Sequence, residues 1–504
     1  MNPPEHWSAD DFRRHAHAAV DFIADYWDRL RSPAAPWPVR SARRPGETAA
    51  LLPDAPPQRP EPWDAIAADL DRVVLPGLTH WQSPNFFGYF PANISGPSVI
   101  GELLSAGLGV QGMLWSTSPA CTEIETRMLD WMARAVDLPR RFWSTAESGG
   151  GVIQGTASEA TLVALVAARA RARACDRADQ PPGVDERFVV YTSRQAHSSV
   201  VKAAMIAGLS RDVQERDGLV GGPASGVRLI DTDDQHRLRP DLLEQAIAAD
   251  RAARRRPCMV VATVGTTGCA AIDDVRAIGT ICARERLWLH VDAAHAGSAC
   301  ICPEHRAIID GIELADSWSF NPHKWLLTNF DCALMWTADR AALVGALSIT
   351  PEYLRNAASD AGVVWDYRDW QIPLGRRFRA LKLWLVMRSY GLDGLRAHIR
   401  EHVRLAELFE SLVRSDDRFE IVTPARLGLV CFRLCAGDDP TRRLLERVNA
   451  DGRVFLSHAV LPVSAGTPGA PADRFVIRMA VGGRFTGEAH VRAAWQHLGA
   501  AAGT

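Results

Sequence analysis

Three lysines are the first residues of this chain that could do unusual chemistry. Of its 57 lysine and arginine residues, only Lys202, Lys324 and Lys382 are lysine. Arginine stays protonated and cannot form an imine, whereas a lysine that loses its proton in a desolvated site can condense with an aldehyde. Compositional drift explains why lysine is scarce but not which lysines remain. The sequence therefore limits an imine-forming residue to three candidates.

The surroundings of the three lysines differ. Lys324 follows a short stretch that we predict as a strand, Ser317–Phe320. Lys202 is expected on the exterior of a helix. Lys382 follows an arginine-rich stretch, and we expect it to face solvent or acidic groups.

A carboxylate and a glycine-rich stretch could complete a site around one of these amines. Asp292 follows the apolar segment Leu287–Val291, which we predict as a buried strand. A buried carboxylate needs a partner because an unpaired buried charge is costly. It could cap a helix, or it could pair with a protonated heterocyclic nitrogen. The glycine-rich stretch 149–158 leads directly into a predicted helix, and a helix N-terminus favours an anion such as a phosphate. A plain turn is an equally consistent interpretation of this stretch.

These three features together suggest pyridoxal phosphate as a cofactor. Asp292 would contact the pyridine nitrogen, Lys324 would form an imine with the aldehyde, and the glycine-rich stretch would bind the phosphate. A dinucleotide site is the competing interpretation, because the glycines also show a GxGxxxG spacing. That fingerprint should follow a strand, and Phe142–Ser148 is not a convincing strand.

Composition excludes several classes of function. Hydrophobic residues make up 47% of the 504 residues, and the formal net charge of −2 argues against a broad basic surface for nucleic acid. No apolar run reaches the length of a membrane span, and residues 1–11 lack the features of a signal peptide. The ten cysteines show neither CxxC pairs nor zinc-ligand spacing, so we expect buried, reduced thiols, no bound metal and a cytoplasmic protein.

The order of predicted elements indicates an α/β fold. Apolar strands predicted at 187–192, 259–264, 287–291, 317–320 and 332–336 alternate with helices such as 158–174 and 273–285, which is typical of a mostly parallel sheet covered by helices. An amphipathic helix is predicted at 8–30, with Ser8 and Asp11 as its capping box. We predict an N-terminal helical and extended segment at 1–91 that packs on a partner subunit, a large cofactor-binding domain at 92–380, and a small α+β domain at 381–504.

In several of its segments the chain resembles the aromatic-L-amino-acid decarboxylase family of group II pyridoxal-phosphate decarboxylases. The similar segments occur at nine places between about residue 80 and residue 480 and follow the order of the family. They read HWQSPNFFGYFP, SPACTEIETRMLDW, GGGVIQGTASEATLVALVAAR, QAHSSVVKA, ATVGTTGCAAID, LHVDAAHAGSA, FNPHKWLLTNFDCALMW, DYRDWQIPLGRRFRALKLW and FVIRMAV.

The resemblance implies a pyridoxal-phosphate-dependent transferase-like fold (fold type I, as in aspartate aminotransferase) and a role for each matched residue. Lys324 would carry the cofactor, Asp292 would pair with its ring nitrogen, and His197 would stack on its ring near the substrate carboxylate. Tyr353 would lie on a mobile catalytic loop. The implied cofactor-binding residues are Ala157, Ser158, His197, Thr267, Asp292, Ala294, Asn321, His323 and Lys324; the implied substrate-side residues are Trp81, Tyr89, Phe90, Pro91, Ala92, His197 and Arg478.

The implied reaction is the loss of CO₂ from tryptophan, tyrosine, phenylalanine or dihydroxyphenylalanine, in a homodimer whose active site is shared between subunits. An aromatic aldehyde synthase is an alternative, although Tyr353 favours simple decarboxylation because aldehyde-forming relatives tend to carry phenylalanine there. An acidic amino-acid decarboxylase would present a further cation to the second carboxylate, and the sequence offers no evident candidate. A catalytically silent homologue is disfavoured by the intact set of Lys324, Asp292, His197 and Tyr353.

Overall fold

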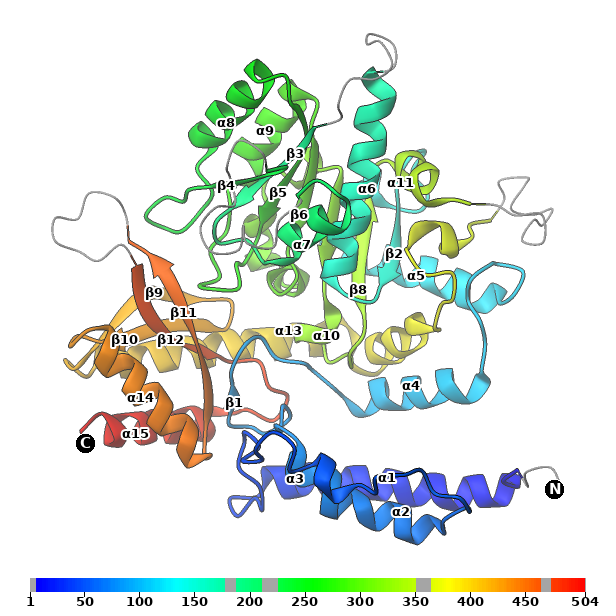
Figure 1. Cartoon of the computed structure of the whole chain (residues 1–504), viewed down its shortest axis with the longest axis vertical. Coiled ribbons are helices and arrows are strands. Elements are labelled where there is room, and N and C mark those ends of the chain that lie inside the picture. The colour runs from blue at the N-terminus through cyan, green and yellow to red at the C-terminus, as the bar shows by residue number, and fades with distance from the viewer. Residues whose placement is uncertain (1–5, 177–186, 211–224, 350–363, 464–472, 504) are drawn as a thin grey trace.

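The computed structural model of the chain describes residues 6–176, 187–210, 225–349, 364–463 and 473–503. Two sheets organise these residues (Figure 1). The larger has seven strands in the order β2-β8-β7-β6-β5-β3-β4, and its neighbours are parallel from β4 through to β7, whereas β8 is antiparallel to both β7 and β2. The predicted α/β class with a mostly parallel sheet is therefore confirmed.

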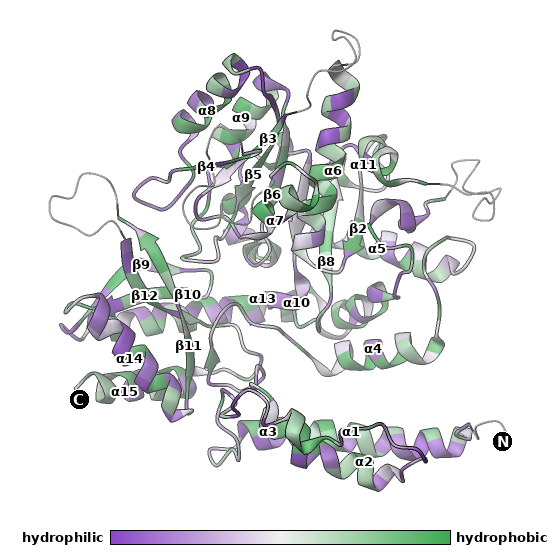
Figure 2. Ribbon diagram, in the orientation of Figure 1, coloured by the Kyte–Doolittle hydropathy of each residue, from purple (hydrophilic) through white to green (hydrophobic). Residues whose placement is uncertain are grey.

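The strands of this sheet are almost entirely buried because helices cover both faces, and Figure 2 shows their hydrophobic character. Their bounds are β2 Gly150–Gln154, β3 Phe188–Ser193, β4 Val227–Ile230, β5 Arg256–Thr263, β6 Trp288–Asp292, β7 Ser317–Phe320 and β8 Ala333–Thr337. The accompanying helices are α5 Pro119–Ala135, α6 Ala157–Asp176, α7 Ser199–Ile206, α8 Pro240–Ala252, α9 Val275–Glu285, α10 Pro322–Trp325 and α11 Arg340–Leu347.

The glycine-rich stretch before α6 is a strand rather than a turn. Gly150 and Gly151 begin β2, which pairs with β8, and only Gly155 and Thr156 separate this strand from the helix. A β-carbon on Gly150 would come within 2.7 Å of the Trp370 ring. Glycine is needed here because the strand packs closely against this ring. Since glycine has a low strand propensity, the sequence did not indicate a strand at this position.

The smaller sheet contains five strands in the order β1-β11-β12-β10-β9, with only β1 and β11 parallel. Their bounds are β1 Phe86–Phe87, β9 Phe419–Arg426, β10 Leu429–Leu434, β11 Phe455–Pro462 and β12 Asp473–Ala480. Helices α14 (Asp438–Asp451) and α15 (Glu488–Ala502) share its hydrophobic core. The kinked α13 (Arg379–Arg414) contributes side chains to the hydrophobic cores of both sheets, so the predicted domain boundary at 380/381 stays a prediction.

The N-terminal helices lie beyond both sheets (Figure 1). Helix α1 (Ala9–Arg31) begins at the predicted capping box of Ser8 and Asp11, and α2 (Trp63–Asp69) and α3 (Leu75–Gly77) follow it. Leu30 is the one buried residue of α1. Helix α4 (Gly96–Leu108) also exposes apolar side chains, with Leu108 at 62%. Within the described residues, no helix is both long and apolar enough to cross a membrane.

Candidate active site

A cavity of about 220 Å³ opens where three neighbouring strands of the large sheet end. Thr263 ends β5, Asp292 ends β6, and Asn321 follows β7. Parallel strands bring their carboxyl ends to one edge, which is where open α/β sheets bind ligands. The cavity is lined by Phe90, Thr156, Ala157, Ser158, His197, Thr263, Gly265, Thr267, Asp292, Ala294, His295, Asn321, His323, Lys324 and Phe330. It thus gathers all the residues that we predicted to bind the cofactor.

Lys324 lies on the short helix α10 directly after β7, and its half-buried side chain faces this cavity. Its amine forms no hydrogen bond or ion pair with any described residue. Burial lowers the pKa of the Lys324 amine, while Asp292 opposes this shift and Arg478 adds to it. A lowered pKa leaves more of the amine neutral, and the neutral amine is the form that attacks an aldehyde.

Asp292 is buried at the end of β6, and its Oδ1 accepts a hydrogen bond from the Ala294 amide at 3.0 Å. No cation lies within ion-pairing distance of its carboxylate in the described parts of the chain. The carboxylate therefore faces the cavity with capacity for a cationic ligand group, such as a protonated heterocyclic nitrogen.

His197 lies at the mouth of the cavity just before α7, with its side chain exposed. Its Nδ1 accepts a hydrogen bond from the Ser199 amide at 3.2 Å, which orients the ring. Neighbouring atoms nevertheless displace enough water to lower the pKa of His197, with Asp292 opposing and Lys324 reinforcing the shift. A neutral imidazole at the mouth can lie flat on a planar ligand.

The cavity fits pyridoxal phosphate on the chemistry of its lining. Ala157 and Ser158 form the first turn of α6, whose amides lack intrahelical acceptors and suit a phosphate. Thr263 Oγ1 and Asn321 Oδ1 are buried polar atoms with no partner among the described residues, as a site built for a polar ligand requires. His323 Nδ1 accepts from the Cys332 amide at 3.0 Å, and burial lowers the pKa of this imidazole to about 3, so it stays neutral.

The residues predicted on the substrate side divide between two cavities. Phe90 lines the cavity of Lys324, whereas Trp81 and Tyr89 stack on each other and line a neighbouring cavity of about 450 Å³. Pro91 packs against Gly482, and the Ala92 carbonyl accepts from the Gln82 amide, so neither lines these two cavities. Tyr353 lies outside the described residues.

Arg478 of β12 lies between these two cavities. Its guanidinium donates to the Gly268 carbonyl at 3.0 Å and to Ser457 Oγ at 2.7 Å, and it lies 5.3 Å from the centre of the Phe90 ring. The side chain is only 2% exposed, yet no described carboxylate pairs with it. A buried cation without a counter-ion is costly, so an anionic ligand group would be favoured beside it.

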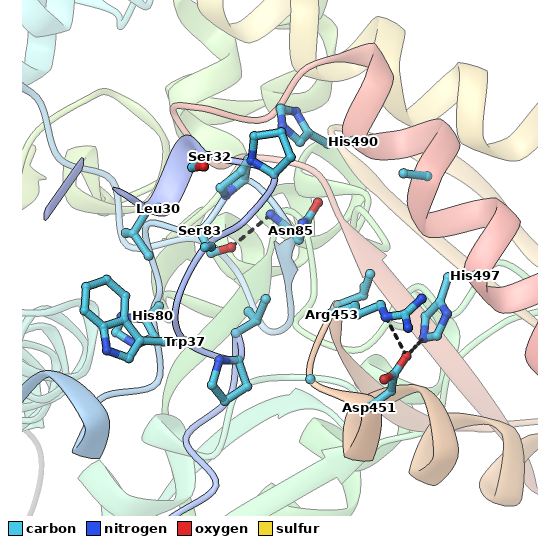
Figure 3. Close-up of a pocket in the computed structure, with 18 of the residues that line it drawn as sticks. Leu30, Ser32, Trp37, His80, Ser83, Asn85, Asp451, Arg453, His490 and His497 are labelled. Atoms are coloured by element: carbon cyan, nitrogen blue, oxygen red, sulfur yellow. Dashed lines mark hydrogen bonds and ion pairs between the residues drawn. The ribbon is translucent and has the colours of Figure 1, made fainter. Parts of the chain in front are cut away.

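A larger cavity lies elsewhere in the described structure. It measures about 870 Å³ and lies between the connector after α1 and helix α15 (Figure 3). Its charged groups are already engaged, since Asp451 contacts both Arg453 and His497. It contains no lysine and no strand end, so the smaller cavity is the better candidate for catalysis despite its size.

Five residues that line the site were not predicted from the sequence: Thr156, Thr263, Gly265, His295 and Phe330. Each lies within one of the segments quoted above, and His295, for example, is part of LHVDAAHAGSA. Proximity in sequence was the available signal. Which neighbours of a motif residue point into a cavity depends on the local path of the backbone.

The chain is similar to known proteins over nearly its whole length. The model of the pyridoxal-dependent decarboxylase conserved domain matches residues 45–435. The aromatic-L-amino-acid decarboxylase of Rattus norvegicus is 46% identical over 493 residues, which cover 97% of this chain and 96% of the relative. The phenylacetaldehyde synthase of Arabidopsis thaliana is 46% identical over 499 residues, covering 97% and 95%. A crystal structure of Oryza sativa TDC with PLP and tryptamine superposes with a TM-score of 0.91 at 42% identity and covers 99% of both chains.

Proposed function

The chain belongs to the pyridoxal-dependent decarboxylase family, and on that premise we propose that it converts an aromatic L-amino acid to the corresponding amine and CO₂. It is a carboxy-lyase whose cofactor is pyridoxal 5′-phosphate. The observation that carries the substrate proposal is a single one. The unpaired amine of Lys324 and the aromatic ring of Phe90 line the same cavity, with Nζ 5.7 Å from the ring centre.

Each group of the cofactor has a candidate partner in this cavity. Lys324 would bind it covalently, Asp292 would pair with its ring nitrogen, and the first turn of α6 would bind its phosphate. Thr267, Ala294, Asn321 and His323 complete the proposed binding set, and His197 would cover the ring. When bound, the cofactor supplies an acceptor for the electron pair that the departing carboxylate leaves behind.

The remaining task of the protein is to orient the substrate. Arg478, which has no carboxylate partner among the described residues, is proposed to attract the substrate carboxylate toward the mouth where His197 lies. Phe90 would hold the aromatic side chain apart from water. Holding the bond between Cα and the carboxylate in one orientation lowers the activation barrier substantially, so these contacts would raise the decarboxylation rate as well as the affinity for the substrate.

Tyr353 is proposed to donate the proton that replaces the carboxylate at Cα. The proposal rests on the sequence resemblance, since this residue lies outside the described structure. Replacing Tyr353 with phenylalanine should divert product from amine to aldehyde, measured by separating both products from one reaction. Unchanged amine output would remove Tyr353 from the mechanism.

We further propose a cytoplasmic homodimer with a shared active site. The support is the unburied apolar surface of the N-terminal helices and α4: Phe12 is 55% exposed, and Leu103 and Leu104 are exposed as well. All nine cysteines whose side chains are described are free thiols, as a reducing compartment favours. The mass of the protein in solution tests the dimer, and a monomer of full activity would contradict it.

The direct test of the proposed function is a product assay on purified, cofactor-loaded protein. Tryptophan, tyrosine, phenylalanine, dihydroxyphenylalanine and glutamate are supplied separately, and CO₂, amine, aldehyde and ammonia are measured. The proposal expects CO₂ and amine in equal amounts from at least one aromatic substrate. Aldehyde with ammonia would assign the chain to the aldehyde synthases, and activity on glutamate alone would reject an aromatic substrate.

A further inference from the structure

A column of buried aromatic rings runs from the cavity to helix α13. The Phe90 and His295 rings are parallel within 13° with centres 3.9 Å apart, and His295 and Trp325 are parallel within 14° at 4.4 Å. Trp325 Nε1 then donates to Nδ1 of His402 on α13 at 2.9 Å. His295, Trp325 and His402 are each at most 2% exposed. The column thus connects the ring beside the reactive amine to the helix that contributes to the cores of both sheets.

The central ring of the column is fixed at its edge as well as on its faces. His295 Nε2 donates to the Leu427 carbonyl oxygen at 3.1 Å, so Nε2 carries a proton. Burial lowers the pKa of His295 to about 3, so the imidazole is neutral. Leu427 belongs to the turn between β9 and β10, next to Gly428. A β-carbon on Gly428, whose φ is +85°, would lie 3.2 Å from the Trp325 ring, so glycine lets this turn approach the column. The small sheet therefore anchors the ring of His295.

The position of Phe90 matters because two cationic side chains lie near its ring. Lys324 Nζ is 5.7 Å and the Arg478 guanidinium is 5.3 Å from the centre of that ring. The ring attracts both through its electron-rich face, and it limits the water that reaches the amine. Tilting the ring would change the surroundings of both groups together.

We propose that His295 is a positioning residue for decarboxylation: by stacking between Phe90 and Trp325, and by its hydrogen bond to Leu427, it holds the Phe90 ring against Lys324. The role belongs to the ring and its orientation and involves no proton transfer. Trp325 adjoins Lys324 in sequence, so the stack also limits the movement of the short helix α10. The inference rests on the proposed function, because the reaction that it would influence is the proposed one.

Two substitutions separate the stack from the hydrogen bond. His295→Phe keeps an aromatic ring and removes the bond to Leu427, whereas His295→Asn keeps a hydrogen-bond donor and removes the ring. Because misplacing a group that positions the reaction costs about 10²-fold, His295→Asn should lower kcat/KM by about 100-fold, mainly through kcat, and His295→Phe by less than about fivefold. Equal losses in both variants would overturn the stacking role.

His290→Asn is the matched control. His290 is also a fully buried imidazole that lies on β6, where its Nδ1 contacts Ser317 Oγ at 2.8 Å, but it does not line the cavity. The thermal midpoints of all variants are measured beside their activities. At a similar loss of thermal midpoint, His290→Asn should keep kcat/KM within about threefold of the wild type. If both asparagine variants lose activity in proportion to stability, His295 has only a structural role.

A second readout does not depend on the substrate. The affinity for pyridoxal phosphate is followed by visible absorbance in the wild type and the three variants. Losing the stack in His295→Asn should admit water and raise the pKa of Lys324. A rise of one pKa unit would leave about tenfold less neutral amine and weaken the affinity for the cofactor about tenfold. Unchanged affinity in that variant would contradict the proposal. If the wild type binds the cofactor but decarboxylates no aromatic amino acid, the proposed function fails, and this affinity series still decides the role of His295.

Discussion

Lys324 and Lys382 are both removed from bulk water, but the two regions that hold them give their amines different partners. Lys382 is 1% exposed and donates to Glu102 Oε2 at 2.8 Å, at the junction of α13 and α4. Lys324 faces an open volume, and no described residue bonds to its amine. Burial lowers the pKa of both amines, to about 8 for Lys382. Burial alone therefore does not mark a reactive lysine; the absence of a counter-ion and the presence of space do.

The junction that holds Lys382 is built for packing. A β-carbon on Gly101 of α4 would come within 2.5 Å of the Lys382 α-carbon, so the two helices touch at their backbones. Glu102 also pairs with Arg377 and accepts from Asn329. A filled junction whose buried lysine is paired with an acid stabilises the fold, whereas the cavity of Lys324 keeps Thr263 Oγ1 and Asn321 Oδ1 without partners among the described residues.

The largest expected effect is on the amine in the cavity. Lys324→Ala removes the group that binds the cofactor covalently, so kcat should fall at least about 10⁴-fold. The variant should fold normally, because a small polar cavity loses only one unpaired amine. Steady-state CO₂ release and the visible spectrum measure the change. An active Lys324→Ala enzyme would contradict the assignment of Lys324 as the reactive lysine.

A smaller effect of another kind is expected at the helix junction. Lys382→Met keeps the volume of the side chain but leaves Glu102 with one cation fewer, so the free energy of unfolding should drop by about 1–3 kcal/mol. Urea unfolding measures the drop. The double variant Lys382→Met, Glu102→Gln is the control and should recover part of it. Visible absorbance should persist in both, and its loss in Lys382→Met would show that this lysine also serves the cofactor site.

Acid should destabilise the region beside the cavity through two buried imidazoles of the aromatic column. Burial lowers the pKa of His402 on α13 to about 4 and that of His295 beside the cavity to about 3. In the unfolded chain both titrate near the ordinary value of about 6.5, so the unfolded state binds more protons below that pH. Their stabilising effect is complete above about pH 6.5, and the free energy of unfolding should fall by up to about 1.4 kcal/mol per pH unit for each as pH drops toward 4.

Urea unfolding at pH 7, 6 and 5 checks this expectation. A single transition whose midpoint falls with pH would support the expectation. Equal stability at pH 7 and pH 5 would contradict the assigned neutral state of these buried imidazoles.

Much of the large sheet could be predicted because its strands are short apolar runs. The prediction for β7 matches the observed Ser317–Phe320, and the other four predicted strands differ by a few residues at their ends. Strand β4 was missed because it has only four residues, two of them partly exposed. Helix α13 is kinked at Gly391, which adopts a non-helical conformation, so its sequence does not follow one continuous helical pattern.

The candidate site was easier to predict from the sequence than the surroundings of its residues. Residues at strand ends, such as Asp292 and Asn321, meet because parallel strands align them. Of the two surroundings expected for Lys382, solvent or acidic groups, the structure confirms the acidic one. Neighbouring Arg376 is likewise buried and pairs with Glu125. An arginine-rich stretch looks like a solvated surface in sequence, and only long-range packing reveals its buried acids.

The most direct test of the account is to identify the lysine that carries the cofactor. The wild-type protein, loaded with pyridoxal phosphate, is reduced with borohydride, digested, and analysed by mass spectrometry, so that the modified lysine is identified among three. The account predicts the cofactor mass on the peptide that contains Lys324 and its absence from those that contain Lys202 and Lys382. Modification of Lys382 or Lys202 in place of Lys324 would contradict it.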